Sequence, residues 1–317
     1  MVPWLRLIRP GDWTKNVFVL VPAVFWLSGE GRGADISEAF EVRLAPLIWT
    51  FVAFCLAASG TYCVNDALDA PKDRQHPVKR RRPVASGAVG VGAAMLVGYA
   101  LQGFALGLAW NTAGTLVGAC VLTYLVLQLA YNLRLKRVPL VDVSVLSTGF
   151  CLRAAAGATA MDVRLSIWLM LCVFFLTLFL GFTKRLCDLS AAENARTAGQ
   201  QVDWQPRIGY ETRDQMNWLL GVSGSLVLMV YLMYTLSPLA DRLYGARAMG
   251  LALLTPLVMI AIHRFYRRAN LGLSDAPLET LRTDRTLLVT IAAYVAGTLL
   301  VLQWPPAESL LQRLLLR

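Results

Sequence analysis

Charged residues are scarce in this 317-residue sequence, and that scarcity excludes an ordinary soluble domain. Asp, Glu, Lys and Arg make up 16% of the chain, compared with about 25% in a typical soluble domain. Apolar residues make up 56% and gather in long runs. A helix that crosses a bilayer needs ~20 apolar residues, and several runs reach that length. The composition therefore predicts an all-α, polytopic membrane protein, with one integral-membrane domain over residues 1–317.

Histidine and cysteine are also used sparingly. Two histidines are too few for a metal site built on imidazole. The six cysteines form no CxxC pair and lie mostly inside apolar runs, which is typical of small packing residues. No cleavable signal peptide is predicted, because the first apolar stretch follows Trp4–Lys15 and continues as a spanning helix. Nucleic acid is not an expected partner, since the basic residues follow the membrane edges without a soluble element that could read bases.

The apolar runs predict about nine transmembrane helices. They are expected near residues 14–28, 44–64, 89–109, 111–130, 138–160, 164–183, 216–236, 248–264 and 286–304. Lys and Arg concentrate in alternate connecting segments, which predicts a multi-pass protein of the cytoplasmic membrane with its N-terminus in the cytoplasm and its C-terminus outside. The net charge of +10 is then one-sided, and for most of these residues attraction to anionic membrane lipids is the simplest interpretation.

One polar stretch, residues 65–83, interrupts the apolar sequence with three carboxylates and an amide followed by a run of cations. On a helix, Asn65, Asp66, Asp69 and Asp73 fall within one arc of about 100°. Clustered oxygen ligands of this kind suit Mg²⁺, which also takes phosphate oxygens as ligands. Pro71 lacks an N–H, so the helix is expected to kink or to end near Ala70. The alternative is a solvated loop whose acids and bases offset each other.

Two further groups of charged residues lie at or inside predicted spans. Lys184 and Asp188 are spaced i,i+4, so they share a helix face, and a simple ion pair between them is the structural alternative to a binding role. Arg153 lies within a span beside Gly157, where a lone cation needs an anionic partner or a water-filled cavity. These residues predict a cavity that opens to the cytoplasm, with a metal-bound diphosphate at its mouth and an apolar wall for a lipid tail.

The pattern Asn-Asp-x-x-Asp-x-x-x-Asp at 65–73 resembles the first aspartate-rich motif of the UbiA superfamily of intramembrane prenyltransferases. A fuller set of motifs resembles the branch that transfers phosphoribosyl to decaprenyl phosphate. These motifs are Arg9-Pro10, Trp13-Thr14-Lys15-Asn16, the residues from Asp73 to Pro83, Gly149 to Gly157, Lys184-Arg185, and Pro277-Leu278-Glu279 with Asp284-Arg285. The resemblance implies a UbiA-like fold of nine helices.

The second motif distinguishes the two kinds of transferase in this superfamily. Its prenyltransferases commonly carry Asp-x-x-x-Asp there, whereas this chain has Lys184-x-x-x-Asp188. The exchange of an acid for a cation favours a substrate with an additional phosphate, such as the 5-phosphate of phosphoribosyl diphosphate. The implied reaction is Mg²⁺-dependent transfer of 5-phosphoribosyl to a polyprenyl phosphate at the cytoplasmic face.

The resemblance also implies residue roles. The expected metal ligands are Asn65, Asp69 and Asp73, and the expected catalytic carboxylates are Asp66, Asp69 and Asp73. The expected substrate contacts are Lys15, Asn16, Arg74, Lys79, Arg82, Tyr131, Arg153, Lys184, Arg185 and Asp188, with Arg153 assigned to the lipid phosphate. Two other functions stay open, an aromatic prenyltransferase of the 4-hydroxybenzoate type and a lipid-binding or transport protein without catalysis. A homo-oligomer is left open as well.

Overall fold

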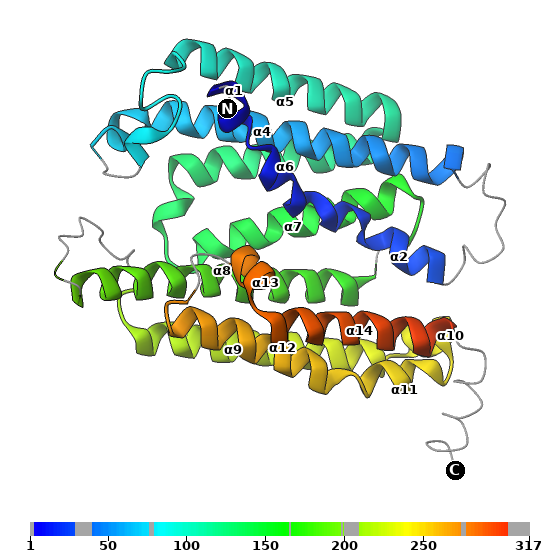
Figure 1. The fold of residues 1–317 in the computed structure, drawn as a ribbon. Helices are drawn as coiled ribbons and strands as arrows, with labels where there is room; N and C mark the ends of the chain where they lie inside the picture. The colour runs from blue at the N-terminus through cyan, green and yellow to red at the C-terminus, as the bar shows by residue number, and fades with distance from the viewer. Residues whose placement is uncertain are drawn as a thin grey trace. The chain divides into compact units, whose positions relative to one another are not determined.

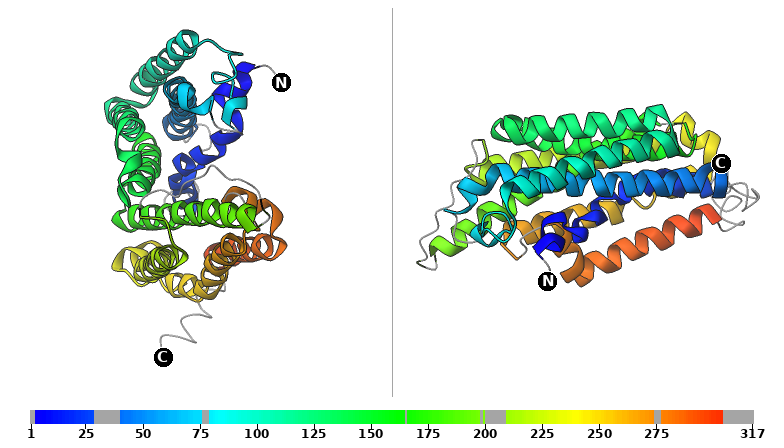
Figure 2. Two further views of the ribbon diagram at one scale, coloured as in Figure 1. Left: turned by 90° about the vertical axis from the view of Figure 1, so that its left-hand side faces the viewer. Right: turned by 90° about the horizontal axis from the view of Figure 1, so that it is seen from above.

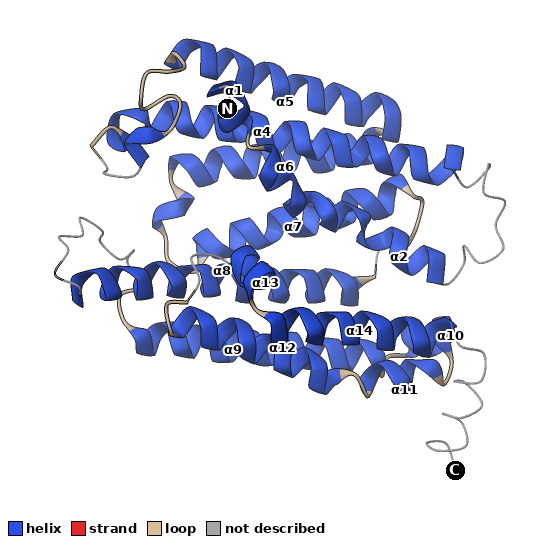
Figure 3. Ribbon diagram, in the orientation of Figure 1, coloured by secondary structure: helices blue, strands red, loops and turns tan. Residues whose placement is uncertain are grey.

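The structure is a computed structural model, and it describes residues 3–28, 40–75, 79–164, 166–197, 199, 209–273 and 277–303. Every regular element in these ranges is helical, and none of the described residues forms a strand (Figure 3). The predicted all-α class is therefore confirmed. The chain divides into two compact units: Met1–Lys136 with Thr148–Leu165, and Arg137–Ser147 with Ser166–Arg317. Helix α7 (Val141–Ala160) supplies residues to both units.

The first unit is organised around its longest helix, α4 (Figure 1). Its elements are α1 (Pro3–Ile8), η1 (Pro10–Leu20), α2 (Val21–Ser28), η2 (Phe40–Leu44), α4 (Ala45–Asp73), η3 (Lys79–Arg81), α5 (Val91–Ala113) and α6 (Thr115–Leu133), with η4 (Leu135–Arg137) at the boundary between the units. Helix α4 packs along α5, where Gly60 and Gly98 meet: a Cβ at Gly60 would lie 2.6 Å from the carbonyl oxygen of Gly98. Small residues at this crossing let the two backbones approach closely, as is common between membrane helices.

The second unit is built on α8 (Ile167–Thr197). Its other helices are α9 (Arg213–Thr235), α10 (Pro238–Tyr244), α11 (Arg247–Ala252), α12 (Thr255–Asn270), α13 (Pro277–Thr283) and α14 (Arg285–Gln303). Helix α8 packs against α9 and α12, and α12 packs against α14 (Figure 2). Phe179, Leu186 and Met216 are fully buried in the core between these helices.

Eight helices among the described residues are long and apolar enough to cross a membrane, and each coincides with a predicted span. The segment predicted as a short span near 248–264 is longer than expected, because α11 and α12 together cover Arg247–Asn270, which is 24 residues. The remaining prediction, a span near 14–28, falls on two elements. There the 3₁₀ helix η1 gives way to α2 at Val21, whose N–H donates to the carbonyl of Phe18, and Pro22 directly after it has no N–H.

Pro71 does not end the acidic helix, which was one of the two outcomes predicted for it. Helix α4 continues to Asp73, and the N–H of Arg74 donates to the carbonyl of Ala70 at 3.1 Å. Proline has no backbone N–H, so a proline inside a helix removes one backbone hydrogen bond. Pro71 lies in the last turn, so few helical residues follow it. The consequence is that all four oxygen-bearing residues stay on one continuous helix.

Candidate active site

The acidic region consists of Asn65, Asp66, Asp69 and Asp73 on the last turns of α4. Asp66 and Asp73 are buried, at 1% and 4% exposed, while Asn65 and Asp69 are half-buried. The C-terminal end of a helix already carries a partial negative charge. Asp73 lies at that end and is repelled by its charge, and the three carboxylates also repel one another, so the region needs cations from other parts of the chain.

Three cations from outside α4 meet these carboxylates. Arg9 and Arg82 donate to the same oxygen of Asp66, Oδ1, at 2.8 and 3.3 Å. Arg82 also donates to Asp73 Oδ2 at 2.8 Å, so one guanidinium bridges the two buried acids. Lys136 Nζ contacts both oxygens of Asp69, at 3.1 and 3.3 Å. Each carboxylate of the acidic region is therefore ion-paired.

Arg9 reaches Asp66 because the segment before η1 is fastened to α4. Arg9 has a left-handed backbone, φ 48°, which turns the chain between α1 and η1. Its guanidinium lies 4.9 Å from the centre of the Tyr62 ring, a cation–π contact. On the same helix, Ser59 donates to the carbonyl of Ile8 at 2.8 Å and accepts from the indole N–H of Trp13 at 3.0 Å. These bonds hold residues 8–13 against α4 beside the acidic region.

The acidic region offers the donors that a hard divalent cation takes. Oxygen is the donor atom of all four residues, and Asp66 Oδ2 is buried without a hydrogen-bond partner among the described residues. The part of the chain that the structure describes contains no group of three His, Cys, Asp or Glu side chains already arranged around a metal position. The residue types fit Mg²⁺, while in this structure cations of the chain hold the carboxylates.

The other predicted substrate contacts near α4 lie at different depths. Lys15 is exposed and its Nζ donates to Asp12 Oδ1 at 2.6 Å. Arg74 and Lys79 are exposed on either side of His76–Val78, which lies outside the described residues. Tyr131 is half-buried in the last turn of α6.

Arg153 and Asn16 lie in the core of the first unit. Arg153 is 6% exposed; its Nε donates to Asn16 Oδ1 at 2.7 Å and its Nη2 to the hydroxyl of Tyr124 at 3.1 Å. The guanidinium also lies over the rings of Tyr124 and Phe150, at 4.5 and 5.1 Å. Among the described residues, the partners of this charge are therefore neutral oxygens and aromatic faces rather than an anion. A contact of either residue with substrate stays a prediction.

The glycine one turn after Arg153 explains why η1 can reach this core. A Cβ at Gly157 would collide with the backbone carbonyl of Val19, so only glycine allows the two backbones to touch. Asn16 and Val19 are three residues apart on η1, and Arg153 and Gly157 are four apart on α7. The two pairs therefore bind the same stretch of η1 to the same face of α7, which is a structural reason for the Arg153-x-x-x-Gly157 spacing.

The basic region is the turn of α8 that holds Lys184, Arg185 and Asp188. Lys184 Nζ contacts Asp188 Oδ1 at 2.8 Å, so the i,i+4 pair predicted as the structural alternative does form. Arg185 Nη2 donates to Asp142 Oδ2 at 2.9 Å, and its Nη1 lies 3.9 Å from Asp188 Oδ2. Asp142 is 1% exposed and also accepts a 2.5 Å hydrogen bond from the hydroxyl of Tyr210.

Sequence reasoning missed four residues that these two regions use: Arg9, Lys136, Asp142 and Tyr210. The sequence held a signal for three of them. Arg9 begins one of the motifs on which the resemblance rests, Lys136 lies in a basic connecting segment, and Asp142 is an acid at the start of a span. None of these signals names a partner, because pairing across 57 or 67 residues depends on the tertiary fold.

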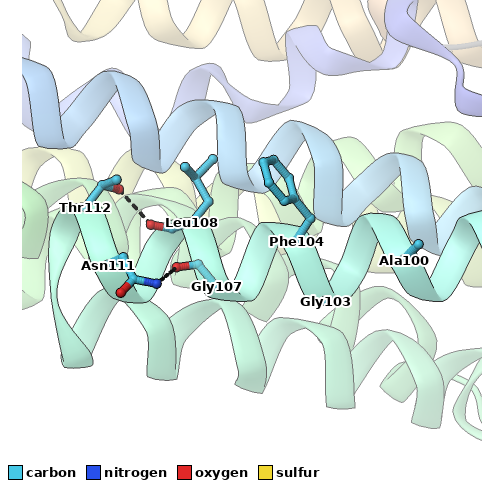
Figure 4. A pocket seen from close by; sticks show the side chains of 7 residues that line it. All are labelled: Ala100, Gly103, Phe104, Gly107, Leu108, Asn111 and Thr112. Carbon is cyan, nitrogen blue, oxygen red and sulfur yellow. Dashed lines mark hydrogen bonds between the residues drawn. The ribbon is translucent and has the colours of Figure 1, made fainter.

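A surface pocket on α5 does not belong to either region. All of its lining residues, Ala100, Gly103, Phe104, Gly107, Leu108, Asn111 and Thr112, come from this one helix (Figure 4). The polar tips of Asn111 and Thr112 bond to carbonyls one turn earlier, of Gly107 and Leu108, both at 2.7 Å. None of the predicted site residues lines it.

The fold and these regions define a polytopic helical membrane protein with charged side chains concentrated at helix ends. The UbiA prenyltransferase family matches residues 20–272, and the chain belongs to this family of membrane transferases. Its sequence is similar to the decaprenyl-phosphate phosphoribosyltransferase of Corynebacterium glutamicum, with 32% identity over 92% of this chain and 84% of the relative. The protein of that name from Mycobacterium tuberculosis H37Rv is also 32% identical, over 92% of this chain and 91% of the relative.

Solved structures support the same fold. A UbiA homolog from Archaeoglobus fulgidus bound to GPP and Mg²⁺ matches with a TM-score of 0.64 at 17% identity, covering 95% of this chain and 99% of that one. A structure described as digeranylgeranylglyceryl phosphate synthase matches with a TM-score of 0.62 at 12% identity, covering 95% of this chain and 97% of that one. At these identities the likeness concerns the fold alone.

Proposed function

We propose that this protein transfers the 5-phosphoribosyl group from phosphoribosyl diphosphate to a polyprenyl phosphate, of the decaprenyl type, in a Mg²⁺-dependent reaction. The reaction takes place at the cytoplasmic face of the membrane, where the N-terminus also lies. The observation that carries the proposal is Lys184 at the position where prenyltransferases of the superfamily commonly have an acid. The similarity to phosphoribosyltransferases along nearly the whole chain points the same way.

In this proposal the acidic region binds the diphosphate. Mg²⁺ held by Asn65, Asp69 and Asp73 would neutralise the diphosphate and make it a better leaving group. Arg82 is suited to a second contact with phosphate oxygens because its guanidinium already reaches two carboxylates of the region and is part-exposed. Lys15, Lys79, Arg74 and Tyr131 are the further candidates for contacts with this end of the substrate.

In this proposal the basic region binds the 5-phosphate. Lys184 and Arg185 are adjacent on α8, and the Lys184 side chain is 43% exposed. Lys offers a point charge and Arg a fork of donors, which together suit a phosphate dianion. Asp188 balances part of this positive charge while the region is empty of substrate.

The transfer step breaks the bond between ribose C1 and the diphosphate oxygen and forms a bond from C1 to an oxygen of the polyprenyl phosphate. Positive charge develops on C1 as the diphosphate leaves, and carboxylates of the acidic region stabilise that charge electrostatically. The attacking phosphate oxygen is already anionic, so no strong general base is required. The products are 5-phosphoribosyl polyprenyl phosphate and diphosphate.

The proposal is tested with purified protein in detergent, radiolabelled phosphoribosyl diphosphate, Mg²⁺ and polyprenyl phosphate. The expected result is label in the organic phase only when both Mg²⁺ and the lipid are supplied. Turnover of a prenyl diphosphate with 4-hydroxybenzoate, without any phosphoribosyl transfer, would assign the chain to the aromatic prenyltransferases. Absence of turnover in both assays, with lipid binding retained, would instead support a lipid-binding or transport protein.

A further inference from the structure

Asp142 connects three segments of the second unit around Arg185. It lies in the first turn of α7, and its two oxygens are used separately: Oδ2 accepts from Arg185 at 2.9 Å and Oδ1 from Tyr210 at 2.5 Å. The Tyr210 oxygen in turn accepts from the backbone N–H of Leu140 at 2.8 Å. A buried carboxylate that ties together a helix start, a cation on α8 and the segment before α9 fixes all three relative to one another.

The segment that carries Tyr210 is held in place by backbone packing as well. Gly209 has a φ of 82°, and a Cβ there would lie 2.7 Å from the Cβ of Pro139. Leu140, which donates to Tyr210, has a left-handed backbone with φ 64°. Burial raises the pKa of the Tyr210 hydroxyl, and the hydrogen bond to Asp142 raises it further, so the hydroxyl keeps its proton and donates.

Arg185 is held by one nitrogen, and its other two nitrogens are incompletely bonded. Its side chain is 12% exposed, and among the described residues only its Nη2 has a short contact with a carboxylate. Its Nε is buried without a hydrogen-bond partner among the described residues, and Nη1 has only the 3.9 Å contact with Asp188. An unsatisfied buried donor is costly, and a phosphate oxygen is a strong acceptor for a guanidinium N–H.

We propose that Asp142 and Tyr210 are positioning residues for phosphoribosyl diphosphate: they hold Arg185 by Nη2 so that its remaining guanidinium N–H groups, beside Lys184, bind the 5-phosphate. This inference rests on the proposed function. Neither residue touches the substrate; both act through Arg185. Asp142 accepts from one of the three guanidinium nitrogens of Arg185, so a buried acid can pair with this cation while other N–H groups of the cation bind an anion.

The test is a titration of the full chain in detergent with phosphoribosyl diphosphate and Mg²⁺ by calorimetry. Asp142→Asn removes the charge but keeps the shape, and we expect its dissociation constant to rise about tenfold, the loss typical of one charge-assisted hydrogen bond. Tyr210→Phe keeps the ring, which packs 6.2 Å from Phe182, and should weaken binding by a smaller factor. The KM for polyprenyl phosphate should stay unchanged in both variants.

A double-mutant cycle separates positioning from a general loss of structure. If Asp142 acts through Arg185, then Asp142→Asn should add little to the loss already caused by Arg185→Met. Asp284→Asn is the matched control, because Asp284 is also buried in this unit and paired with an arginine, Arg264, at 2.6 Å. It should lower the midpoint of thermal unfolding without changing the affinity for phosphoribosyl diphosphate.

The outcomes distinguish this inference from the function on which it rests. Wild-type protein that does not bind phosphoribosyl diphosphate contradicts the proposed function and the inference together. If the wild-type protein binds phosphoribosyl diphosphate and both Asp142→Asn and Tyr210→Phe bind it equally well, the positioning role alone is overturned. Additive losses in the Asp142→Asn/Arg185→Met protein, or an equal loss of affinity in Asp284→Asn, also overturn it.

Discussion

The acidic region of α4 and the basic region of α8 carry opposite charges, and the residues that neutralise those charges come from different places in the chain. On α4, carboxylates gather at a helix end that is already negative, and every cation that pairs with them comes from another segment. On α8, Lys184 pairs with Asp188 one turn away on the same helix, and Arg185 pairs with Asp142 from another helix. The acidic region therefore depends on ion pairs between distant segments, whereas the basic region forms largely within one turn of α8.

The two regions also differ in the kind of buried atom that each leaves without a partner. Among the described residues, the acidic region has one buried carboxylate oxygen without a hydrogen-bond partner, Asp66 Oδ2. In the same part of the chain the basic region has one buried guanidinium nitrogen without a partner, Arg185 Nε. The two regions therefore differ in the charge of the group that each would attract.

The largest expected effect comes from Asp69→Asn in the acidic region. The variant should lose Mg²⁺-dependent turnover by on the order of a thousandfold, because a proposed metal ligand and a charge that stabilises the transition state disappear together. The fold should be retained, since Asp69 and Lys136 have side chains that are 29% and 23% exposed and the freed amine can be hydrated. Turnover and the midpoint of thermal unfolding are measured side by side. Activity like that of the wild type would refute the metal assignment.

Arg82→Met tests whether the acidic region depends on cations from elsewhere. The change leaves two buried carboxylates, Asp66 and Asp73, without the guanidinium that bridges them. We expect destabilisation by about 3 kcal/mol, the lower end of the cost of breaking a buried ion pair. Arg80→Met is the matched control, because Arg80 is exposed in η3, which ends directly before Arg82, and its loss should cost less than ~0.5 kcal/mol. Equal thermal unfolding of the two variants would show that the bridge contributes nothing to stability.

Lys184→Ala tests the basic region and should act on binding more than on stability. Its partly exposed i,i+4 pair with Asp188 contributes only ~0.3–0.5 kcal/mol, so the unfolding midpoint should scarcely move. The affinity for phosphoribosyl diphosphate should fall about tenfold, as expected for one charged contact with phosphate. The apparent affinity for polyprenyl phosphate is measured on the same sample. Equal losses for both substrates would contradict a specific contact with the 5-phosphate.

The smallest expected effect is a pH dependence at Asp284, which serves as a reference acid outside both regions. Burial alone would raise its pKa, but the Leu287 N–H and the Arg264 guanidinium outweigh burial and hold the pKa below its ordinary value. A lowered folded-state pKa gives stability that is present above the unfolded-state pKa of about 4 and is lost as pH falls through the folded-state value. Unfolding midpoints from pH 7 to pH 3 should therefore fall less steeply in Asp284→Asn than in the wild type. Identical slopes would contradict the lowered pKa.

The contrast between the regions also explains what the sequence could predict. The i, i+4, i+8 spacing of Asn65, Asp69 and Asp73 and the i,i+4 spacing of Lys184 and Asp188 follow from helix geometry, and the structure places both sets on single helices. The pairing of Arg9 with Asp66 and of Lys136 with Asp69 does not follow from spacing, because it joins distant segments.

Two expectations can be compared with the structure. Arg153 was expected to need an anionic partner or a water-filled cavity, and its partners among the described residues are the amide of Asn16, the hydroxyl of Tyr124, a carbonyl and aromatic faces, which suit a delocalised guanidinium. Pro71 was expected to kink the helix or to end it near Ala70, and α4 continues to Asp73 because the proline falls in its last turn. Spacing along a helix thus predicted the elements well, but it could not identify the tertiary partners of Arg153.

The most direct test of this account titrates two fragments of the proposed substrate, Mg²⁺–diphosphate and ribose 5-phosphate, into two variants. Asp69→Asn should bind Mg²⁺–diphosphate at least about tenfold more weakly than the wild type and should bind ribose 5-phosphate normally. Lys184→Ala should show the reverse pattern. If both variants lose both fragments equally, or if the wild-type protein binds no ribose 5-phosphate, then the assignment of the 5-phosphate to α8 and of the diphosphate to α4 is wrong.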